Sequence, residues 1–309
     1  MKHNTKITTI LIIMFVITQL IGLFVVSTYI DGLELPYGME PPEEITENPN
    51  QSGSNIIIAF VIAISLFFIL IKLKAETFIR TWFFVVTTLA LGLTITAILF
   101  KLNLNFNIQY IALLIALPLV YIKIFKKQLI VHNLTELFIY PGIAAVFVSL
   151  INVLWIIIIL LLISFYDIWA VWHSQFMEKM AKFQINKIQV FSGFFIPFVN
   201  KKQKQKIKLI KQKYKSKGDK ELEKQFKKAK IKANLAILGG GDVIFPIITA
   251  GVFLKYYGLW PALIISLSAT LALTYLLIAA KKGKFYPAMP FLTIGMFLGM
   301  IVSWLIFPA

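Results

Sequence analysis

The chain contains no cysteine and only three histidines among its 309 residues. The missing thiols exclude disulfides, thiolate catalysis and cysteine-ligated metals. The three histidines, His3, His132 and His173, are scattered and do not show the spacing of a metal-ligand motif. The sequence therefore indicates no metal and no cofactor, and any catalytic chemistry is expected from other side chains.

Charged residues are also scarce, at 15% of the chain, whereas hydrophobic residues make up 59%. Several apolar runs exceed eighteen residues, the length at which a membrane-spanning helix is expected. The first run, 7–30, is longer than the apolar part of a signal peptide, and no small-residue cleavage site follows it. We therefore expect an all-α, multi-pass integral membrane protein that retains its first span.

Nine apolar segments are candidate spans, and they predict a nine-transmembrane-helix bundle. The least obvious boundary lies within 132–174, because one helix there would reach roughly 65 Å, about twice the hydrocarbon thickness. Pro141-Gly142 and the region 149–152 supply possible breaks, so we expect two spans. The nine expected spans are 7–30, 55–72, 80–100, 106–123, 130–150, 152–173, 235–256, 259–280 and 287–307.

Charge is distributed unequally between the two sides of these spans. The loop 31–54 carries six acidic residues and no lysine or arginine. With nine alternating spans, 29 of the 31 basic residues fall on the opposite side, and only Lys101 and Lys255 share the side of this loop. Because basic loops are retained in the cytoplasm, we expect a cytoplasmic N-terminus, an external loop 31–54 and an external C-terminus.

Fifteen lysines in the segment 201–232 account for most of the formal net charge of +17. Nucleic-acid binding is not indicated, because such surfaces favour arginine and an ordered aromatic platform. We expect anionic lipid head groups to attract these lysines, and the mixed stretch 176–198 to lie along the interface. The chain then divides into a six-helix region (1–173), a cytoplasmic loop (174–234) and a three-helix region (235–309).

Two of the four aspartates, Asp167 and Asp242, lie inside long apolar segments. A carboxylate within a membrane helix is costly and usually faces a partner or a wet cavity, so both are functional candidates. Asp167 is about 9 Å of helix rise from the cytoplasmic end of span 152–173, and Asp242 about 10 Å from that of span 235–256. The two carboxylates are therefore expected at similar depth, where they can meet.

Residues that loosen the backbone surround Asp242. Gly239, Gly240 and Gly241 precede it, and glycine permits close helix approach and departure from helical geometry. Pro246 has no N–H, so the carbonyl of Asp242 loses its helical partner. Irregular backbone at membrane depth is tolerated only inside protein or beside a wet cavity, and the combination favours a functional site over ordinary helix packing.

Two carboxylates held close together cannot both ionise cheaply, so the pair shares a proton. The ionised carboxylate can act as a general base toward a water while the protonated one polarises a peptide carbonyl. This is the chemistry of an aspartic protease. An ion-coupled transporter would also use intramembrane carboxylates, but it often shows an internal repeat, and no convincing repeat is present.

Three motifs resemble those of the presenilin-type intramembrane proteases. Tyr166-Asp167 resembles the YD motif of that family, and Gly239 to Asp242 resembles GxGD. Pro287-Ala288-Met289-Pro290 resembles the PAL motif, with methionine in place of the usual leucine, a nearly volume-conserving exchange. A literal Pro-Ala-Leu at 261–263 lies on the external side of the expected topology, and we interpret it as coincidental.

The resemblance covers the motifs, their order and the nine-span layout, and it is strongest to the archaeal presenilin homologues. It implies a catalytic dyad of Asp167 and Asp242, and substrates that are transmembrane helices of membrane proteins or signal-peptide remnants. The residues it implies to shape the site or bind substrate are Tyr166, Gly239, Gly240, Gly241, Pro287, Ala288, Met289 and Pro290. A prepilin-type peptidase also uses a GxGD aspartate, but would not be expected to carry the other two motifs.

Two further polar residues lie near the ends of apolar runs. Glu136 is placed near a cytoplasmic helix end by the expected topology, and we expect its side chain to extend toward the interface. His173, at the end of the sixth span, is interpreted as interfacial.

Overall fold

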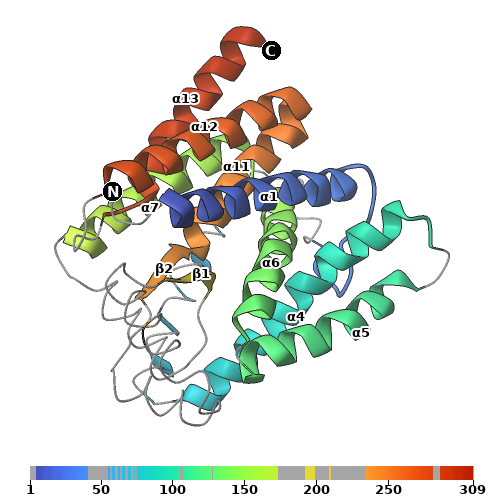
Figure 1. Cartoon of the computed structure of the whole chain (residues 1–309). Helices are drawn as coiled ribbons and strands as arrows, with labels where there is room; N and C mark the ends of the chain where they lie inside the picture. The colour runs from blue at the N-terminus through green and yellow to red at the C-terminus, as the bar shows by residue number, and fades with distance from the viewer. Residues whose placement is uncertain are drawn as a thin grey trace.

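The computed structural model describes residues 5–40, 75–104, 107–126, 128–172, 192–198, 234–280 and 286–308, together with residue 209 and isolated residues between 55 and 73. Helices make up most of this portion of the chain (Figure 1). They are α1 (Thr5–Ile30), α4 (Glu76–Lys101), α5 (Ile108–Tyr121), the π-helix η1 (Ile122–Lys126), α6 (Leu129–Leu150), α7 (Val153–Trp172), α11 (Gly240–Tyr257), α12 (Leu259–Ala279) and α13 (Met289–Ile306). Two strands, β1 (Gly193–Phe198) and β2 (Asn234–Gly239), precede α11.

Seven helices in the described portion of the chain are long and apolar enough to cross a membrane. The expected span 55–72 lies mostly outside the described residues, so the count of nine stays a prediction. The break expected within 132–174 is confirmed, because α6 ends at Leu150 and α7 begins at Val153. Asn152 helps to start the new helix by accepting a hydrogen bond from the Trp155 backbone N–H at 3.0 Å.

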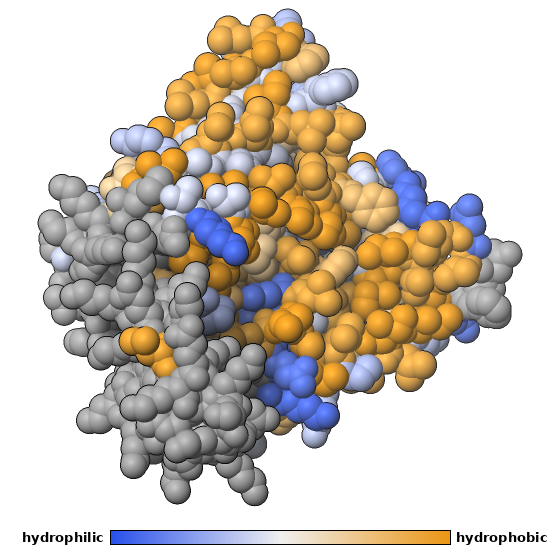
Figure 2. All heavy atoms as spheres, viewed as in Figure 1, coloured by the Kyte–Doolittle hydropathy of each residue, from blue (hydrophilic) through white to orange (hydrophobic). Residues whose placement is uncertain are grey.

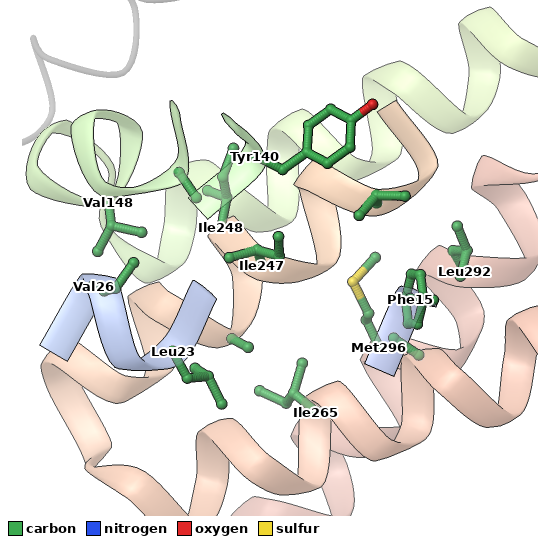
Figure 3. Close-up of a cluster of buried hydrophobic side chains, with 14 of the residues drawn as sticks. Phe15, Leu23, Val26, Tyr140, Val148, Ile247, Ile248, Ile265, Leu292 and Met296 are labelled. Carbon is green, nitrogen blue, oxygen red and sulfur yellow. The ribbon is translucent and has the colours of Figure 1, made fainter. Parts of the chain in front are cut away.

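The main core forms where α1 packs against α6, α11 and α12 (Figure 1). Phe15 of α1, Tyr140 of α6 and Ile247 of α11 are fully buried there (Figure 3). A Cβ at Gly22 of α1 would overlap the Ile247 side chain, so glycine permits this close approach. Small residues at helix contacts are the usual solution in membranes, where packing rather than water exclusion holds helices together. Through this contact α1 supports the helix that carries Asp242.

A second, smaller core joins α4, α5 and η1 to α6. The closest contact lies between α4 and α6, where a Cβ at Gly142 would overlap the Ala90 carbonyl oxygen. The Thr94 hydroxyl adds a hydrogen bond across the same contact, donating to the Phe138 carbonyl at 2.5 Å. Because α6 belongs to both cores, it connects the α4–α5 pair to the rest of the bundle.

The outward faces of the long helices are hydrophobic (Figure 2). Leu114 of α5 is 72% exposed and Leu305 of α13 is 67% exposed, and every long helix carries similar residues. Apolar surface on this scale marks contact with a membrane or a partner. Helices that satisfy their backbone hydrogen bonds internally are one of the two structures able to span the hydrocarbon region. The protein is thus a multi-pass integral membrane protein.

A short antiparallel sheet stands where the start of span 235–256 was expected. The chain remains extended through β2, and α11 begins only at Gly240. The residues before Gly240 pair with β1 instead of continuing the helix backward, and the glycines allow the backbone to change from strand to helix at this point. The pairing strand β1 lies in the stretch 176–198 expected along the interface, and its Phe194 is fully buried against Tyr140.

Candidate active site

Asp167 lies near the end of α7 and is only 6% exposed. Its Oδ2 accepts a hydrogen bond from the Met289 backbone N–H at 3.0 Å, and the Ala288 N–H also donates to this carboxylate. The first N–H groups of a helix have no partner within it, and a helix N-terminus favours negative charge. No side chain of its own caps α13. Asp167 therefore caps α13 from a different helix.

Asp242 is the third residue of α11 and is half-buried. The backbone N–H of Gly239, the residue that precedes the helix, donates to its carboxylate. This is one half of a capping box, in which the third helical residue reaches back to the N-cap N–H. A Cβ at Gly239 would lie 3.2 Å from Asp242 Oδ2, so any larger residue here would force the carboxylate to shift.

The other two glycines of the motif have different surroundings. A Cβ at Gly240 would lie 2.5 Å from Ser192 Oγ and 2.9 Å from the Tyr140 hydroxyl oxygen. The Gly240 N–H also donates to the Ser192 carbonyl at 3.3 Å. Gly241 is exposed, and the nearest atom to its Cβ position is 4.0 Å away on Phe245. The sequence presents the glycines as one run, but only at Gly239 and Gly240 would a Cβ lie within 3.4 Å of another side chain.

The helix that carries Asp167, α7, packs against α11, which carries Asp242, and against α13. The two aspartates are close enough for the charge of Asp167 to act on Asp242. The pairing of the two carboxylates at one depth stays a prediction, and Asp242 lies in the first turn of its helix rather than two turns inside it. Two carboxylates that interact in this way can share a single proton.

The Pro-Ala-Met-Pro segment lies beside Asp167. Pro287 and Met289 are buried, whereas Ala288 and Pro290 are partly exposed. Pro287 and Ala288 precede the helix, and Pro290 occupies its first turn, where its missing N–H costs no helical hydrogen bond. The segment thus passes from irregular backbone into the first turn of α13, and the N–H groups of Ala288 and Met289 point at Asp167.

Tyr166 is exposed, unlike its neighbour Asp167. Its side chain is 50% exposed, and its ring lies 6.4 Å from that of Trp169, measured between centroids. The coincidental Pro-Ala-Leu at 261–263 opens α12, beyond the C-terminal end of α11. The part of α11 from Asp242 to Tyr257, about 22 Å long at 1.5 Å per residue, separates it from Asp242.

Three polar residues near the two aspartates were not singled out from the sequence. Ser164, one turn before Asp167, shares a hydrogen bond of 2.7 Å with the hydroxyl of Thr293 on α13. Gln19 of α1 is 2% exposed, and its Nε2 donates to the Val243 carbonyl at 3.1 Å. The only sequence signal for Gln19 is an amide within an apolar span, and the hydroxyls give no distinct signal.

The expectation for Glu136 was wrong. The side chain does not extend to the interface but is 1% exposed, and it accepts a hydrogen bond from Lys123 Nζ at 2.5 Å. The π-helix η1 brings this lysine into the interior, and a paired cation makes the burial of a carboxylate tolerable. Even with His132 nearby, no group of three potential metal ligands forms among the described residues. His173 lies outside the described residues.

Comparison with known proteins gives two kinds of match. A family model described as "Signal-peptide peptidase, presenilin aspartyl protease" matches residues 12–309. Two solved structures, of a presenilin family intramembrane aspartate protease in C222 and P2 space groups, are each 18% identical to this chain. The first has a TM-score of 0.60 and covers 97% of this chain and 99% of that chain. The second has a TM-score of 0.58 and covers 96% of each. No curated protein matches the sequence.

Proposed function

Since the chain belongs to the signal-peptide peptidase and presenilin family and is an intramembrane aspartyl protease, we propose that Asp167 and Asp242 are its catalytic dyad. One observation carries the assignment. Two carboxylates from different helices lie within reach of each other's charge, and backbone N–H groups at two helix N-termini hold them. Such a pair is a preorganised acid and base.

The reaction needs only this pair and a water. One carboxylate accepts a proton from the water as its oxygen bonds to the carbonyl carbon of the substrate. The other carboxylic acid donates its proton to the carbonyl oxygen, which forms a tetrahedral diol. The C–N bond then breaks as the first group, now a carboxylic acid, donates its proton to the departing nitrogen. The second group, now ionised, accepts a proton from a hydroxyl of the diol, which restores the shared-proton state. The N–H donors from Gly239 and Met289 keep the two carboxylates oriented throughout.

The substrates are transmembrane helices, and a helix conceals its peptide bonds in internal hydrogen bonds, so it must first unwind. Strand β2 runs directly into the turn that carries Asp242, and β1 is the only strand paired with it in the described portion of the chain. An extended substrate can add to the other edge of β2. We assign the segment 287–290 to the side of the substrate site opposite β2. Because proline has no N–H, backbone carbonyls near the prolines lack a helical partner and can accept hydrogen bonds from the substrate. Tyr166 is assigned a site-shaping role beside Asp167.

The orientation in the membrane follows from charge. We place the N-terminus and the loop 174–234 in the cytoplasm and the C-terminus outside, with the lysines of 201–232 against anionic lipid head groups. The six-helix and three-helix regions then each supply one aspartate from the cytoplasmic half of the bundle. Preferred substrates are accordingly single spans with the N-terminus outside, cut in their cytoplasmic half. One cleavable span inserted in both orientations tests this, and efficient cutting of only the N-inside version contradicts it.

The dyad is tested by purification in detergent and incubation with a helical membrane peptide. Mass spectrometry should detect cleavage within the apolar stretch of the peptide, and a transition-state-analogue inhibitor of aspartic proteases should abolish it. Asp167→Ala and Asp242→Ala proteins serve as matched controls. Cleavage that persists in either variant at the wild-type rate would refute the assignment.

A further inference from the structure

The outer edge of strand β1 is held by a side chain of α6. Asn133 Nδ2 donates to the Phe195 carbonyl at 2.7 Å, and the Phe195 N–H donates to Asn133 Oδ1 at 2.9 Å. A carboxamide carries a donor and an acceptor side by side, as does a backbone residue of a neighbouring antiparallel strand. Asn133 therefore takes the place of one residue of a third strand.

His132 holds the same edge two residues away. Its Nε2 lies 2.8 Å from the Gly193 carbonyl oxygen, and because a carbonyl only accepts, this nitrogen carries the hydrogen. Glu136, one helical turn along, lies 3.7 Å from the same nitrogen and is itself paired with Lys123. Residues 193 and 195 face the same edge because backbone groups alternate along a strand. The edge of β1 is thus taken up by α6.

The contacts that Asn133 and His132 make with the outer edge of β1, called the α6 clamp below, determine which residues of β1 bond to β2. Phe195 lies opposite Ile237 and directs its N–H and carbonyl away from it, so the ladder bonds come from the even-numbered pairs, such as Phe194 with Leu238. The same alternation extends to Ser192, whose carbonyl accepts from the Gly240 N–H at 3.3 Å. A continuous set of hydrogen bonds therefore runs from Asn133 through β1 and β2 to Gly240, two residues before Asp242.

The opposite edge of β2 is left for another chain. Among the described residues no strand pairs with it, and the backbone groups of Ile237 point toward it. A strand added there is aligned with Asp242 through the same ladder, because Gly239 both belongs to β2 and donates to the Asp242 carboxylate. A shift of one residue in such pairing would place a different peptide bond at the dyad.

We propose that Asn133, supported by His132, is a positioning residue that sets the register between substrate and dyad and so selects the peptide bond that is cut. The proposal rests on the function proposed above. Asn133 contacts β1 rather than either aspartate, and it acts through β1, β2 and the turn at Gly240. Without the α6 clamp, the sheet keeps its two strands but loses its fixed position against α6.

The experiment compares three variants at position 133 on one transmembrane peptide. Asn133→Asp keeps the size and the acceptor but places an acceptor against the Phe195 carbonyl, Asn133→Ala removes both groups, and Asn133→Gln retains both on a longer side chain. Asn152→Ala is the matched control, because its amide oxygen also accepts from a backbone N–H but at the start of α7, away from the sheet. Mass spectrometry measures the fraction of product from each peptide bond, and steady-state kinetics separates kcat from KM.

We expect the Asp and Ala variants to lower kcat about tenfold, as for the loss of two hydrogen bonds, with a larger share of cuts at bonds neighbouring the main wild-type site. Gln should restore some of the wild-type pattern, and the Asn152 control should keep it. An unchanged distribution of cuts in the Asp and Ala variants overturns the role proposed for Asn133. Cleavage by the wild-type protein in the same assay shows that the proposed protease function still holds in that case. Loss of folding in all three variants, measured by thermal unfolding, also overturns the role proposed for Asn133, because the α6 clamp would then serve the fold.

Discussion

The two aspartates reach one site by different routes. Asp242 is held locally, because the Gly239 N–H only three residues earlier donates to its carboxylate. Asp167 is held by the Met289 N–H, which lies 122 residues away in the sequence. One carboxylate depends on the start of its own helix, and the other on how α7 packs against α13. Each nevertheless receives the same kind of donor, a backbone N–H at a helix N-terminus.

The two carboxylates therefore share one proposed chemical role but depend on different structural supports. The proposed chemistry requires both carboxylates and treats them as one unit. Their placement, however, responds to different disturbances. Changes to the glycine run should displace Asp242, whereas changes to the contact between α7 and α13 should displace Asp167. Variants of the dyad itself should therefore behave alike, and variants of its supports should not.

The largest effect is expected from the carboxylates themselves. Asp167→Ala and Asp242→Ala should each lower the cleavage rate by about 10⁴-fold or more, and the double variant should be no slower, because groups that act as a unit are not additive. Single-turnover cleavage of a membrane peptide measures this. Thermal unfolding should show that each variant still folds. A single variant that cleaves well above the double variant would show that the two groups do not act together.

The shared proton predicts a bell-shaped dependence of the cleavage rate on pH. Below the optimum both carboxyls are protonated and no base remains, whereas above it both are ionised and no acid remains. Each limb should fall about tenfold per pH unit. Asn at position 167 or 242 should remove activity at every pH instead of shifting the optimum. A flat profile, measured on peptide whose helicity is constant over the range, would contradict a shared proton.

The three glycines offer a graded test of the support for Asp242. A Cβ at Gly240 would collide with Ser192 and Tyr140, and one at Gly239 would press on the Asp242 carboxylate. Either alanine should lower kcat about 10²-fold, the scale of a 1 Å misplacement. Gly241→Ala is the matched control and should retain activity while raising stability by about 0.5–1 kcal/mol. Equal losses at all three positions would mean that the run acts through flexibility rather than space.

A smaller effect is expected from the support for Asp167. The hydroxyls of Ser164 and Thr293 share a hydrogen bond of 2.7 Å between α7 and α13. Ser164→Ala and Thr293→Val should each cost about 1 kcal/mol of stability and lower kcat by about fivefold, with the two losses overlapping in a double-mutant cycle. Thr274→Val is the control, because its hydroxyl donates within α12 to the Thr270 carbonyl. Fully additive losses would show that the hydroxyls are not coupled.

The local half of the site could be predicted from the sequence more fully than the distant half. A glycine run before an intramembrane aspartate signals irregular backbone wherever it occurs, and the structure has a strand-to-helix turn there. The strand itself was missed, because β2 is short and apolar and such a run cannot be told from a helix by periodicity. The contact between Asp167 and Met289 depends on the packing of α7 and α13, which no local pattern reports.

Residues that serve the sheet were also invisible in the sequence. Asn133 stands in the first turns of a membrane helix, where a polar residue is ordinary, and its role emerges only when β1 lies beside it. Glu136 was assigned to the interface because its partner Lys123 comes from the preceding span and turns inward through a π-helix. In both cases the missing information was which elements pack together, not which residues are present.

The smallest effect is expected from Met289→Leu, and it sharpens the contrast between backbone and side chain. The Met289 side chain is 4% exposed and fills space, while its N–H makes the contact with Asp167. Met289→Leu should therefore cost less than about 1.5 kcal/mol and leave the cleavage rate near that of the wild type. Met289→Pro is the informative partner, because proline suits the first position of a helix but has no N–H to donate. It should lose most of the activity, and it should also lower the thermal unfolding midpoint because the buried side chain is truncated. An equal loss of activity in the Leu and Pro variants would show that the side chain, not the backbone, places Asp167.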